Sequence, residues 1–255
     1  MSLTGVIVNK VIKLPKVTDF NSYLFVGPHP DDIEIGAGAL ISKLIRMGKK
    51  VSFIICLDGR FGSVNCPLLT GMELVKTRQK EALQSAEMLG VKDVRFLGFS
   101  DGGFYDPKEL ERTLVKTIGE IGPDIIFGPD PDMRNECHKD HIMVGEVLKR
   151  IGYLTSFTNI MDEYGAKATD LKAMGFFMTD KPNSYVKVSK ADFEKQVKAV
   201  FECHLTQYPK NSELAKNVEL YMRVRSFDYG LRKFGTHGEC FRILDSMRMH
   251  CLPEG

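Results

Sequence analysis

Short apolar runs alternate along this chain with longer segments whose apolar residues recur every three or four positions. Tyr23–Gly27 and Val51–Leu57 are runs of the first kind, and each predicts a buried strand. Between them, residues 37–45 carry apolar side chains at helical spacing, and Gly48 provides a helix stop. This order of strand, loop, helix and strand is the repeating unit of a parallel sheet.

The alternation continues through the rest of the chain. Asp106 and Ser189 are predicted to cap helices, because each has a side-chain oxygen directly before a helical pattern. Further strands are predicted at Val94–Leu97, Asp124–Phe127, Phe176–Met178 and Tyr185–Val188, and further helices at 72–89, 107–121, 139–152, after 189 and at 212–231. The sequence therefore predicts one α/β domain over residues 1–255, with a mostly parallel sheet and a small carboxy-terminal elaboration.

Composition narrows the class of protein. Lys and Arg total 35 and Asp and Glu total 33, so the net charge of +2 argues against a nucleic-acid partner. Hydrophobic residues make up 43% of the chain, which is typical of a globular core. Apolar runs such as Phe53–Leu57 are too short for a membrane span. Met1–Leu3 and Glu254–Gly255 are interpreted as remnants of cloning.

The six cysteines form no C-x-x-C pair, and the amino terminus has no apolar signal-peptide core. These two features predict reduced thiols and a cytoplasmic protein.

The first cluster of polar residues follows the first predicted strand. His29, Asp31, Asp32 and Glu34 place one imidazole and three carboxylates within six residues. In a parallel sheet, ligands bind beyond the carboxyl ends of the strands, near the point where the strand order reverses. The position of this loop therefore makes it a candidate binding site.

A second cluster, Cys137–His141, follows the predicted strand Asp124–Phe127 and opens a helix. Either cluster alone would be explained by turns and helix caps. Together they offer imidazoles and carboxylates at one sheet edge, which suits zinc or another divalent transition metal with an open catalytic position. The residues of this predicted metal site are His29, Asp31, Asp32, His138, Asp140 and His141.

These motifs resemble the LmbE-like family, also called the PIG-L or N-acetylglucosamine deacetylase family. The resemblance rests on Pro28–Glu34 and His138–His141, and extends to Arg78–Glu81, Ser100–Gly102, Glu194–Gln207 and Glu239 with Phe241. It implies a Rossmann-like three-layer sandwich and a zinc-dependent hydrolase. The implied reaction removes the acetyl group from a small N-acetylated amino sugar or its conjugate, and relatives often form homo-oligomers.

The resemblance also implies a role for each matching residue. His29, Asp32 and His141 would ligate zinc, and Asp31 would be the general base. His138 would protonate the leaving amine or stabilise the oxyanion, with Asp140 orienting and charging it. Arg78 would hold the substrate. Asp130 and His237 are further candidates for substrate contact, with a solvated loop as the alternative for each.

The division of labour in the first motif also has a physical reason. Adjacent carboxylates do not readily bind one metal with the same geometry, so one of Asp31 and Asp32 is free to face a bound water. Two alternatives stay open: hydrolysis of another amide, such as a thiol-sugar conjugate, and a non-catalytic metal- or sugar-binding protein. Ser100 lies in a G-x-S-x-G sequence but is not expected to be a nucleophile, because no helix follows it directly.

Overall fold

The protein is described here by a computed structural model that covers residues 11–251. The terminal residues interpreted as remnants of cloning lie outside this range. Within it, one mixed sheet has the strand order β3-β2-β1-β4-β5-β7-β6. The strands are β1 (Ser22–Gly27), β2 (Lys50–Leu57), β3 (Asp93–Phe99), β4 (Ile125–Pro129), β5 (Ala173–Phe177), β6 (Ser184–Lys187) and β7 (Gly238–Asp245).

The first five strands are parallel, and the last two add an antiparallel edge. β1 pairs in parallel with both β2 and β4, so the chain turns back across the sheet at β1. β7 runs antiparallel to β5 and to β6. The predicted α/β fold with a mostly parallel sheet is confirmed, and the reversal of strand order lies next to the first polar cluster.

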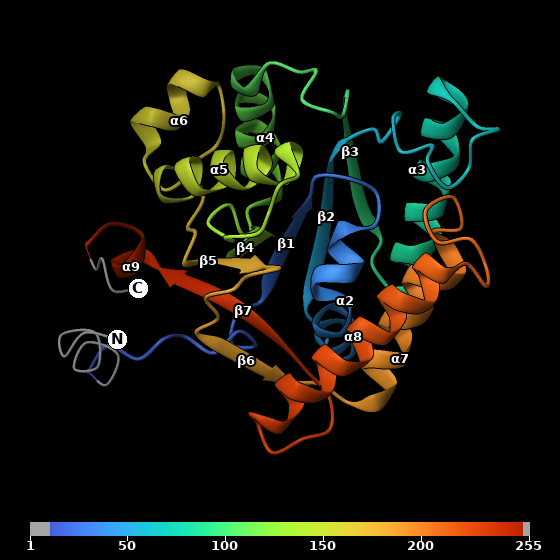
Figure 1. The fold of residues 1–255 in the computed structure, drawn as a ribbon. Coiled ribbons are helices and arrows are strands. Elements are labelled where there is room, and N and C mark those ends of the chain that lie inside the picture. The colour runs from blue at the N-terminus through green and yellow to red at the C-terminus, as the bar shows by residue number, and fades with distance from the viewer. Residues whose placement is uncertain (1–10, 252–255) are drawn as a thin grey trace.

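Helices cover both faces of the sheet (Figure 1). One face packs against α2 (Asp32–Arg46), α3 (Gly71–Leu89) and α7 (Lys190–Lys198). The other packs against α4 (Pro107–Ile121), α5 (Lys139–Leu154) and α6 (Thr158–Tyr164). Three further segments belong to the carboxy-terminal elaboration: a π-helical turn (Ala199–Cys203), α8 (Glu213–Leu231), which packs on β6 and β7, and α9 (Ser246–His250). These layers form the predicted three-layer sandwich.

Local sequence signals explain where two of the helices begin. The Asp106 carboxylate accepts a hydrogen bond from the backbone N–H of Lys108 at the start of α4. Ser189 and Asp192 form a reciprocal capping box at the start of α7. β7 and α6 were not among the predicted elements, because neither has a clear apolar period of its own. β7 is instead stabilised by its pairing with β5 and β6.

The described helices include none that is long and apolar enough to cross a membrane. All six cysteines lie within the described range and are unpaired.

The start of β4 is tied to the start of β1 through one carboxylate. Asp124 accepts hydrogen bonds from the backbone N–H groups of Asn21 and Ser22 and from Lys172 Nζ, over 2.8–3.0 Å. Its partial burial opposes ionisation, but these donors outweigh burial and lower the pKa of Asp124 to about 2. The ionised form is therefore the one that the folded state favours.

We expect Asp124→Asn to lower the free energy of unfolding by about 1–2 kcal/mol at pH 7, since the ionised acceptor is lost. The folded pKa lies below the ordinary value of 3.8, so this contribution is present above pH 3.8 and is lost as the pH falls toward 2. Urea unfolding of both proteins between pH 7 and pH 3 measures the difference. The exposed Asp162→Asn is the control. An equal stability of wild type and Asp124→Asn at pH 7 would contradict the expectation.

Candidate active site

A strained turn after β1 carries the first polar cluster. Asp31, at the N-cap position of α2, has φ 143°, a conformation that a residue with a side chain rarely adopts. The next residue, Asp32, receives a hydrogen bond of 2.7 Å from the backbone N–H of His29. The turn therefore separates the two adjacent carboxylates: Asp32 folds back onto His29, and Asp31 stays available to other groups.

Three side chains that could ligate a metal converge beside this turn: His29 from the turn, Asp32 from the start of α2 and His141 from α5. His29 Nδ1 lies 3.2 Å from Asp32 Oδ2, and His141 Nε2 lies 3.3 Å from Asp32 Oδ1. A ligand atom from each of the three residues lies within 4.8 Å of the others. Two imidazoles and one carboxylate at such separations match the three protein ligands of a catalytic zinc site. These residues could therefore hold a divalent metal.

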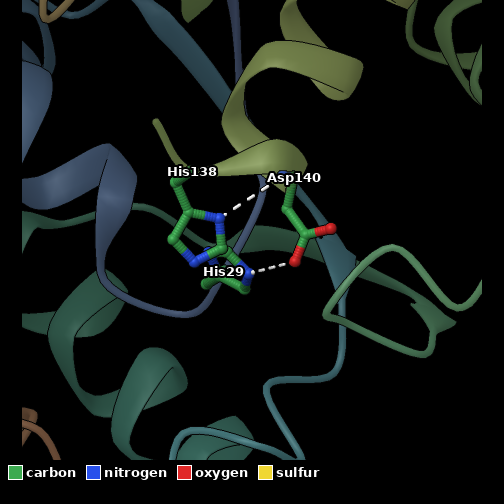
Figure 2. A group of neighbouring side chains, drawn as sticks. All are labelled: His29, His138 and Asp140. Carbon is green, nitrogen blue, oxygen red and sulfur yellow. Dashed lines mark hydrogen bonds and ion pairs between the residues drawn. The ribbon is translucent and has the colours of Figure 1, made fainter. Parts of the chain in front are cut away.

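A second group of three potential metal ligands shares His29 with the first. It contains His29, His138 and Asp140, with ligand atoms again within 4.8 Å of one another. Figure 2 shows that Asp140 reaches two different partners: its carboxylate lies 3.1 Å from His29 Nε2, and its backbone N–H donates to His138 Nδ1 over 3.3 Å. The Asp140 carboxylate also accepts hydrogen bonds from the backbone N–H groups of Gly102 and Gly103.

Asp140 was expected to orient and charge the ring of His138. In the structure its carboxylate contacts the ring of His29 instead. The ring of His138 instead stacks on that of His141 at a centroid distance of 4.7 Å. Burial, together with the nearby imidazoles of His29 and His141, lowers the pKa of His138. Because Nδ1 accepts a hydrogen bond, the neutral ring carries its proton on Nε2.

The electrostatics of the cluster favour a cation. Burial alone would lower the pKa of His29, but the carboxylates of Asp140 and Asp32 outweigh it and raise that pKa to about 10. Burial is likewise outweighed at His141, whose pKa rises to about 9 beside Asp32. Negative potential that stabilises imidazolium between these carboxylates would also stabilise a divalent metal, which would displace the protons.

Asp31 differs electrostatically from Asp32. Burial raises the pKa of Asp31 to about 6, although the Arg78 guanidinium, 3.4 Å away, opposes the shift. Arg78 itself is buried and donates to the backbone carbonyls of Gly59 and Pro30. Asp31 is thus a carboxylate that can exchange a proton near neutral pH.

These residues open into a cavity of about 370 Å³. Its wall contains residues of both polar clusters and of the loops after β2 and β3. The lining residues are His29, Asp31, Asp32, Phe61, Gly62, Val64, Arg78, Asp101, Gly102, His138, Asp140, His141 and Gln207. Six predicted metal or catalytic residues and Arg78 therefore share one cavity.

The other two predicted substrate contacts lie elsewhere. Asp130 is buried, and its carboxylate accepts hydrogen bonds from Arg242, Thr179 and the backbone of Asp132. It is neither a solvated loop residue nor part of the cavity wall. The ring of His237 packs against that of Phe193 in α7, with centroids 5.1 Å apart, and His237 is not among the residues that line the cavity. Neither placement supports contact with a substrate in this cavity.

Two features of the site were missed from the sequence. Glu136 Oε2 lies 3.0 Å from His141 Nδ1, whereas the acidic approach to the second motif suggested only a solvated loop. The last carboxylate of the first motif, Glu34, is buried and lies 3.3 Å from Nε2 of the buried His204. The position of Glu136, two residues before His138, was the signal available for the first; only the fold could pair residues 34 and 204.

Comparison with known proteins adds independent support. Residues 24–151 match the family model described as PIG-L, GlcNAc-PI de-N-acetylase. The diacetylchitobiose deacetylase of Thermococcus kodakarensis is 31% identical over 92% of this chain and 87% of its own length. A 1D-myo-inositol 2-acetamido-2-deoxy-alpha-D-glucopyranoside deacetylase of Kineococcus radiotolerans is 28% identical over 50% of this chain and 43% of its own.

The solved structure of N,N'-diacetylchitobiose deacetylase from Pyrococcus horikoshii, complexed with its inhibitor MPG, has a TM-score of 0.85 to this chain. The two are 28% identical, and the match covers 99% of this chain and 97% of the other. These relatives are deacetylases of N-acetylglucosamine-type sugars or conjugates. The match over the first motif, the second motif and the sheet between them shows that this chain belongs to the PIG-L family.

Proposed function

We propose that this protein is a metal-dependent deacetylase that hydrolyses the acetamide of an N-acetylglucosamine-type sugar or conjugate. The observation that carries the proposal is the separation of Asp31 from Asp32. One carboxylate contacts both imidazoles of the candidate metal site, while the other lines the same cavity with a pKa near 6. A hydrolytic site needs this second carboxylate as a base, and a site that only binds a cation does not.

The metal ligands of the proposed enzyme are His29 Nδ1, Asp32 and His141 Nε2. In this set, the remaining nitrogen of each imidazole faces a carboxylate, Asp140 for His29 and Glu136 for His141. Such outer carboxylates set the tautomer of metal-bound histidines. The overlapping set with His138 and Asp140 is less suited, because the Asp140 carboxylate is already engaged by Gly102 and Gly103.

A divalent metal bound there, zinc in our proposal, would lower the pKa of a water and polarise the amide carbonyl. Asp31 accepts a proton from the attacking water while the oxygen of that water bonds to the carbonyl carbon. His138 donates through Nε2–H to the negative charge that develops on the carbonyl oxygen. Asp31 then returns its proton to the nitrogen as the C–N bond breaks, which releases acetate and the free amine.

Arg78 keeps Asp31 close to the reacting atoms through the 3.4 Å contact between their side chains, and it lines the cavity that receives the sugar.

The six unpaired cysteines support the further proposal that the enzyme works in the reducing cytoplasm. Hydrolysis of a different amide stays the alternative, since Asp31 and His138 would serve it equally.

We expect Asp31→Asn to retain zinc and lose about 10²–10⁴-fold in kcat, because the proton acceptor is removed and the metal ligands are kept. Metal content is measured on purified protein, and release of primary amine and acetate is followed with N-acetylglucosamine and N,N'-diacetylchitobiose. Full turnover by the variant would overturn the assignment of the base. A wild-type protein that cleaves only other amides would favour the alternative substrate class.

We expect Asp140→Asn and Glu136→Ala each to weaken zinc binding by about 10–100-fold, because each removes the carboxylate that holds a ligand histidine. Competition with a chromophoric chelator measures the affinity directly. Asp101→Asn is the matched control, since Asp101 lines the same cavity but contacts the backbone N–H of Phe61 instead of a histidine. Unchanged zinc affinity in both folded variants would contradict the proposed ligand set.

A further inference from the structure

Helix α8 presents a row of large apolar side chains to solvent. The helix lies at the outside of the fold, beside β6 and β7 (Figure 1). Leu220, Val224, Phe227 and Leu231 follow one another at intervals of four, three and four residues, so they lie on one face of the helix. Each of the four is between 53% and 62% exposed. We call these four residues the α8 stripe.

The opposite face of α8 is already used to dock the helix on the rest of the fold. Ser226 and Gly230 are buried on that face. A Cβ added to Gly230 would lie only 2.4 Å from the backbone nitrogen of His237. The backbone N–H of Gly238 donates to the Ser226 hydroxyl. The helix therefore packs through its small residues, and a rotation that buried the α8 stripe would break this packing.

The exposed apolar surface around the α8 stripe is large enough for a stable protein interface. Tyr221 lies next to the stripe and is exposed, and Phe234, in the turn after the helix, is 97% exposed. Judged from residue sizes and exposed fractions, the stripe with Tyr221 and Phe234 offers about 700 Å² of surface, close to the roughly 800 Å² that each partner contributes to an interface of standard size. Monomeric proteins seldom leave an apolar patch of this size in water.

Ion pairs within the chain largely neutralise the charges that border the α8 stripe. Arg223 pairs with Glu194 over 2.9 Å and with Glu219 over 2.7 Å. Arg232 pairs with Asp228 over 3.3 Å. An anionic membrane or a nucleic acid selects a face with a marked basic excess. A border of paired charges instead suits an apolar protein surface with a similar border.

A second copy of this chain has such a surface. The spacing of four and three residues lets the side chains of one helix fit between those of another, as in coiled coils. In an antiparallel pair about a twofold axis, Leu220 lies level with Leu231 of the partner subunit, and Val224 lies level with Phe227 of the partner subunit. Every layer of the stripe is then apolar on both sides, and the smaller valine faces the larger phenylalanine.

We propose that two copies of this protein associate through the α8 stripe, as an antiparallel pair of α8 helices about a twofold axis. None of the four stripe residues is among those that line the candidate active site. Association through this face therefore leaves the cavity accessible and is separate from the proposed function.

The mass of the full-length protein in solution, measured by sedimentation equilibrium, tests the proposal. Wild type should be a dimer or a larger assembly with an even number of copies. Val224→Glu and Phe227→Glu should each halve that mass, with a rise of at least about 100-fold in the dissociation constant, because each brings two like charges to the twofold axis. A monomeric wild type would overturn the proposal.

Leu83→Glu is the matched control for these variants. Leu83 is a leucine on the surface of α3 with a similar exposed fraction, 48%, and its replacement should leave the mass of wild type unchanged. Circular dichroism of each variant measures whether its helices are intact. If folded Val224→Glu and Phe227→Glu proteins both keep the wild-type mass, another surface holds the copies together and the proposal is wrong.

A mixture of opposite charges tests whether the two stripes face each other. Val224→Glu and Val224→Lys should each lose the association alone, and an equimolar mixture should regain it, because the substituted side chains lie close to the twofold axis. A contact between the stripe and a different surface would be weakened by both substitutions and would not recover on mixing. A mixture that does not regain the mass of wild type would therefore refute the pairing.

Cysteine cross-linking tests the antiparallel orientation. The Leu220→Cys protein mixed with the Leu231→Cys protein should form more disulfide-linked dimer under mild oxidation than either protein alone. Wild type gives the baseline, since Cys137 and Cys251 are exposed in every sample. Stronger cross-linking of the Leu220→Cys protein alone would show a parallel pair and contradict the proposed arrangement.

A lipid surface is the rival partner of the α8 stripe. Co-sedimentation with vesicles of phosphatidylcholine and phosphatidylglycerol tests it. Wild type that stays dimeric in the supernatant supports the proposal. Monomeric wild type that binds the vesicles, with binding lost in Phe227→Glu, would assign the stripe to lipid and refute the pairing of two copies.

Discussion

The pairing of β1 with β4 is the contact on which the candidate active site depends. Their register joins Tyr23 to Ile125 and Phe25 to Phe127, so the loops after both strands emerge at the same edge of the sheet. The loop after β1 carries His29, and the loop after β4 leads into α5, whose first turn carries His141. Since β4 reaches this place only after three crossovers, the metal site exists only in the folded protein, and metal binding is coupled to folding.

Around this contact the protein arranges carboxylates in two layers. Asp32 touches both imidazoles of the candidate ligand set, and Asp140 and Glu136 support the same imidazoles from outside. So much negative charge in a buried space would be costly without cations. Asp31 lies outside this network, beside Arg78, and burial raises its pKa to about 6. Burial and pairing thus give adjacent carboxylates of one motif opposite properties.

The sequence predicted the parts of the fold that depend on local pattern. The apolar runs located β1 and β2, and the helix signals at Asp106 and Ser189 marked real boundaries. The two polar clusters were expected to meet, because they follow strands of one parallel sheet, and they line one cavity.

The side-chain contacts that the sequence did not predict depend on the packing of segments that are distant in the chain. Asp140 faces His29 instead of the His138 ring because the loop at Gly102 and Gly103 approaches from β3 and holds it. His237 was assigned by its place in a motif, yet it packs on α7. Asp130 was expected to face solvent or substrate, but Arg242 from β7, a strand with no clear signal, reaches it. The partners of these side chains are set by how distant segments pack in the folded protein, and the pattern of residues along the chain does not encode that packing.

The glycine pair that holds Asp140 has a consequence for how this site can diversify. Gly102 and Gly103 support the carboxylate with backbone N–H groups, and both have φ values above 70°. A peptide group cannot be altered by substitution of a neighbouring side chain. The support of His29 therefore depends on the backbone of this loop and not on the side chain of the next residue, Phe104, which is exposed. A change of side chain at position 104 would therefore alter the surface of the loop and leave the backbone contacts to Asp140 in place.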